Sequence, residues 1–532
     1  MSSQEMQLEL FDEKLDRLFE DLDQGQLPGA VVGIAVRGVP IYRRGFGLAN
    51  MELPLLLTPS TRLRIGSITK HFTALAYLLQ CESGRCSVDD TVGTYLPELS
   101  PAVRAAQIWQ LMGNISGLRD AHDIRWQFSG IERAVTSDEI LAQYREIEDL
   151  AFAPGTNWAY NNGNWLLLTA IVERLCGGPL EEILARQILE PAGLYDTLLR
   201  RYDCDFVPRS ATLHTARPEG GFQKLNLGTA LAGEGGLVST LDDMLRWMKH
   251  LDTPVIGKPS TWEYLKRPMI LANGTCTHYA CGLIHDCYRG LETLQHPGGV
   301  LGGSAHILKV PKLDLDVVVL TNRSDVFAVH LADRILDRCV KGLKPRMQPP
   351  AIKSTGLYRS SRSGRVVQLS AQGDEQIVAI DSVEMPARED RDGVLWVEGR
   401  WFGYTNRVTC LKRFGDRDRP QRIELREFGN NDALERLGES EPEEGMRRIG
   451  EYRSESLGTQ ARIVEIGGSL QLQTAGRFGC ATYHLESLAP CVWRARQRSA
   501  MLWGGILTFD SPTGGFRFSG YTNRLLPFER VS

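Results

Sequence analysis

The sequence predicts a multidomain α+β protein, in which a first domain of mixed helices and strands is followed by two small β-domains. The chain has 532 residues, whereas a single hydrophobic core stops growing at about 250 to 300 residues. Pro and Gly interrupt the chain at residues 342–350, and such a segment cannot continue a helix. Beyond it, short alternating strands replace the helical patterns of the first part.

Composition and charge narrow the class of protein. Hydrophobic residues make up 42% and charged residues 24% of the chain, which is typical of a globular protein. The 61 basic and 65 acidic residues give a net charge of −4, so no positive field would attract nucleic acid. We find neither the about 18 to 20 continuous apolar residues that cross a bilayer nor a signal-peptide pattern. We therefore expect a cytoplasmic protein without a nucleic-acid or membrane partner.

The 11 cysteines are scattered along the chain, and we expect most of them to be buried free thiols. The tightest group consists of Cys276, Cys281 and Cys287, near His278 and His285. Its irregular spacing favours a mixed strand and loop segment over a zinc site. We predict no metal and no organic cofactor.

The first domain is predicted to span residues 1–341. Residues 1–22 alternate acidic with apolar side chains and predict an amphipathic helix. Residues 30–36 and 41–42 predict two antiparallel strands joined by a tight turn. Helical patterns then dominate to about residue 200. Further strands are predicted at residues 235–238, 305–310 and 315–320, and a last helix at residues 325–340.

Two linkers divide the rest of the chain. A Pro-rich linker at residues 342–355 and a polar linker at residues 439–449 leave two β-domains, residues 356–438 and 450–532. Their short alternating segments and closely spaced turns indicate a small barrel or a sandwich.

The two β-domains share sequence at both ends. Gly356-Leu-Tyr-Arg-Ser is repeated as Gly450-Glu-Tyr-Arg-Ser, and Leu434-Glu-Arg-Leu as Phe528-Glu-Arg-Val. Both repeats have the same offset of 94 residues, which indicates a duplicated β-domain. The pentapeptide Gly-Tyr-Thr-Asn-Arg also occurs twice, at residues 403–407 and 520–524, but outside this register. We interpret that match as a coincidence or a shifted strand.

A serine and a lysine lie one turn apart at the start of a predicted helix. Ser67 and Lys70 precede apolar residues at helical spacing, and the pattern ends at Gly84. A serine hydroxyl becomes a nucleophile when a base takes its proton, and a lysine with a lowered pKa can do so. Free N–H groups at the helix start can stabilise an oxyanion. The alternative interpretation is a capping serine followed by a solvated lysine.

Two later motifs can complete a hydrolytic site. Tyr160 and Asn162 lie in a polar loop before an apolar helix, where the phenol can relay a proton and the amide can bind a peptide-like substrate. The alternative is a buried tyrosine with a capping asparagine. His296, Gly298 and Gly299 follow a predicted short strand, where glycine lets a substrate approach the sheet edge. The alternative there is a glycine-rich turn.

In this order, the three motifs resemble the serine β-lactamase and penicillin-binding protein superfamily, which carries Ser-x-x-Lys, Tyr-x-Asn and a basic residue-x-Gly. Segments similar to its class C-like branch are residues 88–97, 115–118, 188–197 and 235–243. The resemblance covers residues 25–341 and implies an antiparallel sheet flanked by helices. It implies that Ser67 is the acylated nucleophile, Lys70 its base and Tyr160 a second proton-transfer group. It also implies substrate contacts by Asn162, His296, Gly298 and Gly299, with the N–H groups of Ser67 and Gly299 as the oxyanion hole.

His296 restricts the resemblance to fewer families of the superfamily, because penicillin-binding proteins and most β-lactamases have lysine at this position. Histidine is mostly neutral at pH 7, so binding of a substrate's C-terminal carboxylate is less favoured. The chain resembles the D-stereospecific aminopeptidases, which combine His-x-Gly with two C-terminal antiparallel β-barrels. Segments similar to that family are residues 101–104, 116–120, 160–164, 450–454 and 497–499. The resemblance implies a homodimer that acts on small D-amino acid peptides, amides or esters, and inhibition by β-lactams.

One segment departs from the D-aminopeptidase pattern. In that family a loop of the last domain carries an aspartate near the substrate's amino group, whereas residues 497–505 here are shorter and contain no acid. We therefore expect hydrolysis through an acyl-enzyme and assign no residue to the substrate's amino group. The alternatives are an esterase or β-lactam-interacting hydrolase on the same scaffold, and a non-catalytic, penicillin-binding-like sensor.

Overall fold

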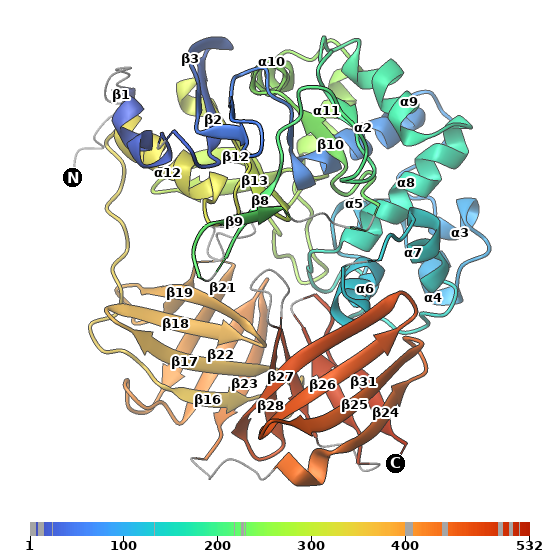
Figure 1. Ribbon diagram of the computed structural model, residues 1–532, viewed down its shortest axis with the longest axis vertical. Coiled ribbons are helices and arrows are strands. Elements are labelled where there is room, and N and C mark those ends of the chain that lie inside the picture. Colours follow the sequence, from blue (N-terminus) through green and yellow to red (C-terminus); the bar gives the residue numbers. More distant parts are fainter. Residues whose placement is uncertain are drawn as a thin grey trace.

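The computed structural model describes residues 7–8, 15–23, 25–131, 133–217, 219–224, 228, 230–398, 408–438, 445–497, 504–509, 514–520 and 522–531. An α+β domain lies above two β-barrels that stand side by side (Figure 1). This arrangement confirms the predicted fold class. The proposed domain boundaries themselves stay a prediction.

A six-stranded antiparallel sheet in the order β11-β12-β13-β14-β2-β3 forms the centre of the first domain. Its strands are β2 (Ala30–Val36), β3 (Val39–Phe46), β11 (Ile284–Tyr288), β12 (Leu291–Val300), β13 (Gly303–Val310) and β14 (Leu315–Thr321). Successive side chains of a strand point to opposite faces. Val32 and Ile34 therefore pack with α12 (Ala328–Cys339), whereas Val31 and Ala35 belong to the core under α10 (Leu241–Asp252). The sheet is thus buried on both faces.

Helices and short strands complete the first domain. The helices are η2 (Gly66–Ile68), α2 (Thr69–Glu82), α3 (Val92–Tyr95), α4 (Pro101–Arg104), α5 (Ile108–Met112), α6 (Ala121–Ser129), α7 (Ser137–Gln143), α8 (Asn162–Cys176), α9 (Leu180–Leu184), η3 (Ala185–Leu189), α11 (Pro259–Lys266) and η4 (Pro311–Leu313). The short strands are β4 (Leu48–Asn50), β5 (Leu55–Leu56), β6 (Leu63–Arg64), β7 (Leu198–Leu199), β8 (His214–Ala216), β9 (Phe222–Lys224) and β10 (Leu237–Ser239). In the part of the chain that the structure describes, no helix combines the length and apolar character needed to cross a membrane.

The N-terminal segment differs from the predicted helix of residues 1–22. Gln7–Leu8 forms strand β1, which pairs with β15 (Val340–Lys341). The hydrogen bonds that β15 offers at its edge replace helical ones there. Leu15 and Asp16 are α-helical and continue into the 3-10 helix η1 (Arg17–Leu22), while residues 9–14 lie outside the described residues. Leu15, Phe19 and Leu22 are buried against the sheet and α12, so the predicted apolar face exists over residues 15–22.

Each β-domain is a closed barrel of eight antiparallel strands. The first contains β16 (Gly356–Arg359), β17 (Val366–Gln372), β18 (Glu375–Ile380), β19 (Val383–Glu389), β20 (Leu395–Val397), β21 (Thr409–Phe414), β22 (Arg422–Glu427) and β23 (Asn430–Arg436). After the 3-10 helix η6 (Gly445–Arg448), the second contains β24 (Gly450–Ser454), β25 (Thr459–Ile466), β26 (Ser469–Gly476), β27 (Gly479–Ala489), β28 (Val492–Arg496), β29 (Gly505–Thr508), β30 (Phe516–Ser519) and β31 (Leu526–Arg530).

The repeated sequence segments are the strands that close the two barrels. Tyr358 pairs with Arg436 in the first barrel, and Tyr452 pairs with Arg530 in the second. Closure pairs the first strand with the last and leaves no free sheet edge. It also decides between the barrel and the sandwich that the sequence left open. Of the repeated pentapeptide, residues 403–407 lie outside the described residues.

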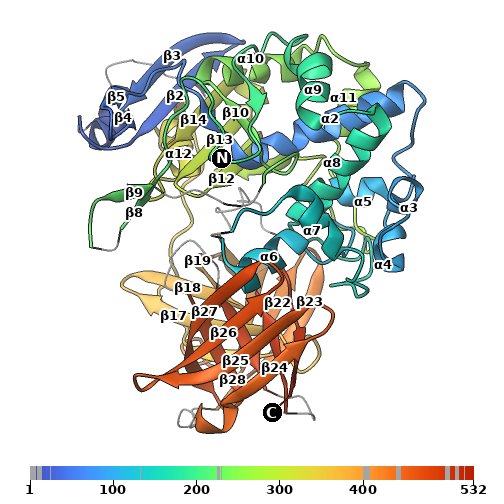
Figure 2. The ribbon, with the colours of Figure 1, turned by 45° about the vertical axis from the view of Figure 1, so that its right-hand side comes forward.

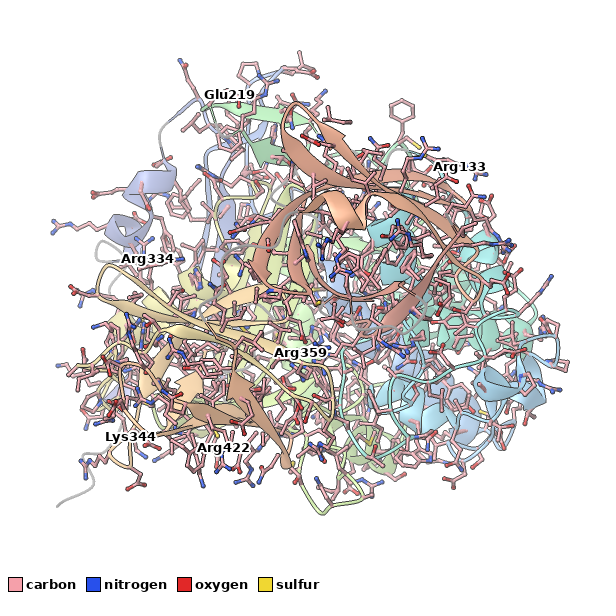
Figure 3. All side chains as sticks on the ribbon, turned by 90° about the horizontal axis from the view of Figure 1, so that it is seen from below. Arg133, Glu219, Arg334, Lys344, Arg359 and Arg422 are labelled. Carbon is pink, nitrogen blue, oxygen red and sulfur yellow. The ribbon has the colours of Figure 1, made fainter. Side chains whose placement is uncertain are left out.

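Helix α6 joins the first domain to the second barrel, as Figure 2 shows. Its Phe128 lies 5.1 Å from Phe518 and 5.4 Å from Phe528, measured between ring centroids. The end of the helix is therefore part of the barrel's own apolar core. Figure 3 shows the molecule from below. Arg133 of the first domain lies beside the second barrel, with which it forms a hydrogen bond, while Arg359 and Arg422 lie in the first barrel.

Candidate active site

Ser67 lies in the turn that leads into helix α2. Gly66–Ile68 forms the single 3-10 turn η2, and α2 continues directly from it. The helix predicted at Ser67 is therefore confirmed, with a tighter first turn. Gly66 has a φ of +53°, and a Cβ there would lie 2.9 Å from the main-chain nitrogen of Gly299. Glycine thus lets this turn approach strand β12.

Lys70 lies one turn after Ser67 and has no exposed surface. Its Nζ lies 3.0 Å from Ser67 Oγ, 2.8 Å from Asn162 Oδ1 and 2.6 Å from the main-chain oxygen of Glu234. Burial lowers the pKa of Lys70 to about 7, against the opposing effect of the Glu234 and Asp120 carboxylates. A neutral amine can donate to two of these oxygens and accept the Ser67 proton. The alternative of a solvated lysine is therefore wrong.

Tyr160 provides the second contact to the serine. Its Oη donates to Ser67 Oγ at 2.7 Å, and its ring lies 4.8 Å from Lys70 Nζ. The structure thus brings a nucleophile, an amine and a phenol within hydrogen-bonding distance. Such a set can take a proton from the serine and pass one to a leaving group.

Asn162 begins helix α8, but the cap of this helix is its neighbour. Asn161 accepts the N–H of Asn164 at 3.0 Å, whereas the Asn162 carboxamide faces Lys70. The carboxylate of Asp120 accepts the N–H groups of Asn162 at 2.8 Å and of Gly163 at 3.1 Å. The capping alternative therefore applies to Asn161, and Asn162 can hold the lysine. Asp120 has no role in the sequence prediction.

Strand β12 carries the third motif. His296, Gly298 and Gly299 lie within this strand and pair with β13, so the prediction that they follow a strand is wrong. A Cβ at Gly298 would lie 1.9 Å from the main-chain oxygen of Ile65, so glycine lets the strand pass close to the serine turn. Gly299 is exposed beside that turn. The role of its N–H in an oxyanion hole stays a prediction.

The side chain of His296 is only 1% exposed. Its Nε2 lies 3.5 Å from the hydroxyl of Tyr279, and its Nδ1 2.6 Å from the main-chain oxygen of Pro297. Burial and the nearby Lys70 amine lower the pKa of His296 well below its usual value. The imidazole is therefore neutral. Its contact with substrate stays a prediction.

Residues 15–340 match the Beta-lactamase family. The chain belongs to this family. A D-aminopeptidase of Gluconobacter oxydans is 28% identical over 338 residues, which is 63% of this chain and 64% of that protein, less than two thirds of its length. A D-aminopeptidase of Brucella melitensis biotype 1 is 26% identical over 488 residues, 88% of this chain and 87% of that protein. The family and these relatives identify a serine hydrolase.

One solved structure shares the fold over most of the chain. The octameric penicillin-binding protein homologue from Pyrococcus abyssi is 23% identical, with a TM-score of 0.58. The likeness covers 80% of this chain and 100% of that one. It supports the arrangement of the Beta-lactamase family domain with its sheet and helices.

Glu234 and His122 form a buried pair behind the site of this Beta-lactamase family member. His122 Nε2 lies 3.4 Å from Glu234 Oε1. Burial acts to raise the pKa of Glu234, but the nearby His122 holds it below its usual value. Neither residue is predictable from the sequence, because no local motif marks them and only the fold brings Glu234 to Lys70 and His122 to Glu234.

A side chain of the first barrel packs against Trp158, which lies next to Tyr160. Phe428, in the hairpin between β22 and β23, lies 5.0 Å from Trp158 between ring centroids. Trp158 in turn lies 6.3 Å from Tyr160 and 5.7 Å from Tyr279. The side chain of Asn430 donates to the main-chain oxygen of Thr156 at 3.1 Å. The aromatic cluster Phe428, Trp158, Tyr279 and Tyr160 thus extends from the barrel to the serine.

Among the described residues, no group of three or more His, Cys, Asp or Glu side chains could hold a metal ion. All eleven cysteines are free. Three of them, Cys281, Cys339 and Cys410, are buried, so the expectation that most are buried is wrong. The others lie on helix surfaces, strands and loops, where a small side chain tolerates partial exposure.

Proposed function

We propose that the chain is a serine hydrolase that releases N-terminal D-amino acids from small peptides and amides through an acyl-enzyme at Ser67. The observation that carries the proposal is the double contact of Ser67 Oγ, with Lys70 Nζ at 3.0 Å and Tyr160 Oη at 2.7 Å. A buried amine with a pKa of about 7 is half neutral at pH 7 and can act as a base.

The reaction begins when neutral Lys70 takes the proton of Ser67. The oxygen attacks the amide carbonyl carbon, and the N–H groups of Ser67 and Gly299 stabilise the oxyanion that forms. Tyr160 gives its hydroxyl proton to the leaving nitrogen and takes in return the proton that Lys70 holds, the C–N bond breaks, and the acyl group stays on Ser67 as an ester. Water then attacks this ester, releases the acid and returns the proton to Ser67.

The D-amino acid specificity is supported by the relatives, which are named D-aminopeptidase. The neutral His296 supplies no permanent cation for a C-terminal carboxylate, which favours cleavage at the N-terminal residue. Residues 498–503 of the segment that lacks an acid lie outside the described residues. We also propose a cytoplasmic location and, from the family resemblance, a homodimer that β-lactams inhibit.

The test is steady-state hydrolysis of paired D- and L-alanine p-nitroanilides by the full chain. Cleavage of the D-anilide alone is the expected result, and Ser67→Ala should abolish it. The hydrogen bonds described for Ser67 Oγ join it to Lys70 and Tyr160 rather than to a helix end, so this variant should keep the wild-type circular dichroism. Rapid turnover of p-nitrophenyl acetate or nitrocefin without D-anilide cleavage would instead favour the esterase or β-lactam-interacting alternative. No modification of Ser67 by an acylating probe would favour the non-catalytic sensor.

A further inference from the structure

The second barrel inserts one side chain into the first domain. Asn523, in the segment between β30 and β31, has no exposed surface. Its Oδ1 accepts the main-chain N–H of Asp120 at 3.0 Å, and its Nδ2 donates to the main-chain oxygen of Asp120 at 3.1 Å. One carboxamide therefore pairs with both main-chain groups of a single residue. This fixes the position of Asp120 relative to the barrel.

Neighbouring contacts hold the same segment. The guanidinium of Arg119 donates to the main-chain oxygen of Arg524 at 2.6 Å. The hydroxyl of Thr522 donates to the carboxylate of Asp123, and Asn523 Nδ2 lies 3.2 Å from the same oxygen. Residues 522–524, which belong to one copy of the repeated pentapeptide, thus contact the start of helix α6 through three consecutive residues.

Asp120 connects the starts of two helices. Its carboxylate caps α6 by accepting the N–H groups of His122 at 3.0 Å and Asp123 at 3.2 Å. It also accepts the first two N–H groups of α8, those of Asn162 and Gly163. A carboxylate at a helix start is stabilised by these unpaired donors and by the helix dipole. A shift of Asp120 would therefore move the start of α8.

The start of α8 in turn holds the base of the proposed reaction. Asn162 Oδ1 accepts a hydrogen bond from Lys70 Nζ at 2.8 Å, and Lys70 Nζ lies 3.0 Å from Ser67 Oγ. Hydrogen bonds thus run from Asn523 through Asp120 and Asn162 to Lys70. Proton transfer requires reacting atoms within about 3 to 3.5 Å. A small displacement along this path would therefore reduce the rate.

We propose that Asn523 is a positioning residue that acts through Asp120 and Asn162 to set Lys70 against Ser67. The second barrel is then part of the machinery for proton transfer, and its pentapeptide segment is the functional contact. This inference rests on the proposed function in one respect, the acylation of Ser67, and is independent of the substrate's stereochemistry.

The test compares Asn523→Ala with Arg477→Ala in the full chain. Arg477 of the second barrel pairs with Glu146 of the first domain at 2.5 Å, and both are partly exposed, so Arg477→Ala disturbs the same interface away from Asp120. Asn523→Ala should lower kcat for p-nitrophenyl acetate by about tenfold or more with KM changed less than about threefold. Arg477→Ala should leave both within about twofold. Equal effects of the two substitutions would overturn the proposal.

A double-substitution cycle separates positioning from general stability. Because the path runs through Asn162, adding Asn523→Ala to Asn162→Ala should cost less than about twofold further in kcat. Losses that multiply independently would contradict the proposal. The acid limb of the kcat/KM profile of Asn523→Ala should also move to higher pH, since a displaced Lys70 is better hydrated. An unmoved limb together with a wild-type kcat would contradict it too.

Two controls keep the outcomes distinct. If Asn523→Ala does not fold, Asn523→Ser, whose hydroxyl can still bind one main-chain group of Asp120, carries the same comparison and should show an intermediate kcat. A wild-type kcat in that folded variant would overturn the proposal. Mass spectrometry of wild-type protein after p-nitrophenyl acetate tests acetylation of Ser67. Acetylation without D-anilide cleavage would reject the D-aminopeptidase function alone, whereas no acetylation would reject both.

Discussion

The phenol of Tyr160 donates a hydrogen bond to Ser67 Oγ at 2.7 Å, while its ring lies 4.8 Å from Lys70 Nζ. One aromatic residue thus contacts both the nucleophile and its base. Tyr160 can pass a proton between the serine oxygen and a leaving nitrogen without a large movement. The ring also favours a cation at Lys70, which would stabilise the amine after it has taken the serine proton.

Tyr160→Phe should therefore slow hydrolysis strongly. Removal of the hydroxyl deletes one proton-transfer group and keeps the ring, so kcat should fall by about a hundredfold or more with little change in KM. Steady-state kinetics with the D-anilide measures both constants. Near-normal kcat in the variant would refute a proton-transfer role for Tyr160.

The rate should depend on the protonation of Lys70. Its pKa is lowered to about 7 by burial, and only the neutral amine can accept the Ser67 proton. kcat/KM should therefore rise with pH through about 7 and fall roughly tenfold for each unit below it. A pH–rate profile from pH 5 to 9 tests this. An acid limb that lies below pH 5 would show that another group is the base.

The aromatic contact between the first barrel and the site predicts a further effect on catalysis. Phe428 is 7% exposed and packs on Trp158, so Phe428→Ala would leave a cavity and destabilise the fold by about 3 kcal/mol. Loss of support for Trp158 should displace Tyr160 and lower kcat/KM by about tenfold. Phe428→Leu should restore most of the rate.

Arg426, which is exposed on strand β22 of the same barrel, provides the matched control for this prediction. Arg426→Ala should leave both the thermal midpoint and kcat/KM close to those of the wild type, since exposed positions contribute little to stability. Unchanged kcat/KM in a destabilised Phe428→Ala variant would show that the contact serves stability alone.

The sequence predicts those parts of the site that are local in the chain. Ser67 and Lys70 lie one turn apart where η2 continues into α2, so their spacing alone brings them together. The sequence predicts that His296 follows a short strand, and Pro297, which lacks an N–H, is unusual inside a sheet. Yet β12 lies between β11 and β13, and Pro297 pairs there with His306. Pairing on both sides evidently outweighs the missing donor.

Residues that contact each other across domains could not be predicted from the sequence. Asp120 and Asn523 are 403 positions apart, and neither belongs to a spacing that local structure dictates. The pentapeptide around Asn523 has a copy at residues 403–407, but this copy lies outside the 94-residue register and indicates a coincidence or a shifted strand. Barrel closure shows the physical reason for the difference: the register of the strands fixes the repeat, whereas a connecting segment is free to contact another domain.

The interface between the barrels predicts a loss of stability in acid. Burial acts to raise the pKa of Glu427, but the charges of Arg365 and Arg524 lower it to about 2, while an unfolded chain would have the ordinary value near 4.5. A group with a lowered pKa in the folded state stabilises that state above the unfolded pKa. This contribution is therefore complete above about pH 4.5 and is lost as the pH falls toward 2.

Arg524→Met should weaken this effect while it keeps most of the apolar volume. Arg524 from the second barrel lies 3.9 Å from Glu427 and 3.3 Å from Asp381 of the first, so its removal raises the pKa of Glu427. The midpoint of acid unfolding, followed by circular dichroism, should move up by about half a pH unit. Arg462→Met is the matched control, because the exposed Arg462–Glu451 pair lies within the second barrel and should leave the midpoint unchanged. Identical midpoints for both variants would mean that the cations around Glu427 do not govern the acid stability of the paired barrels.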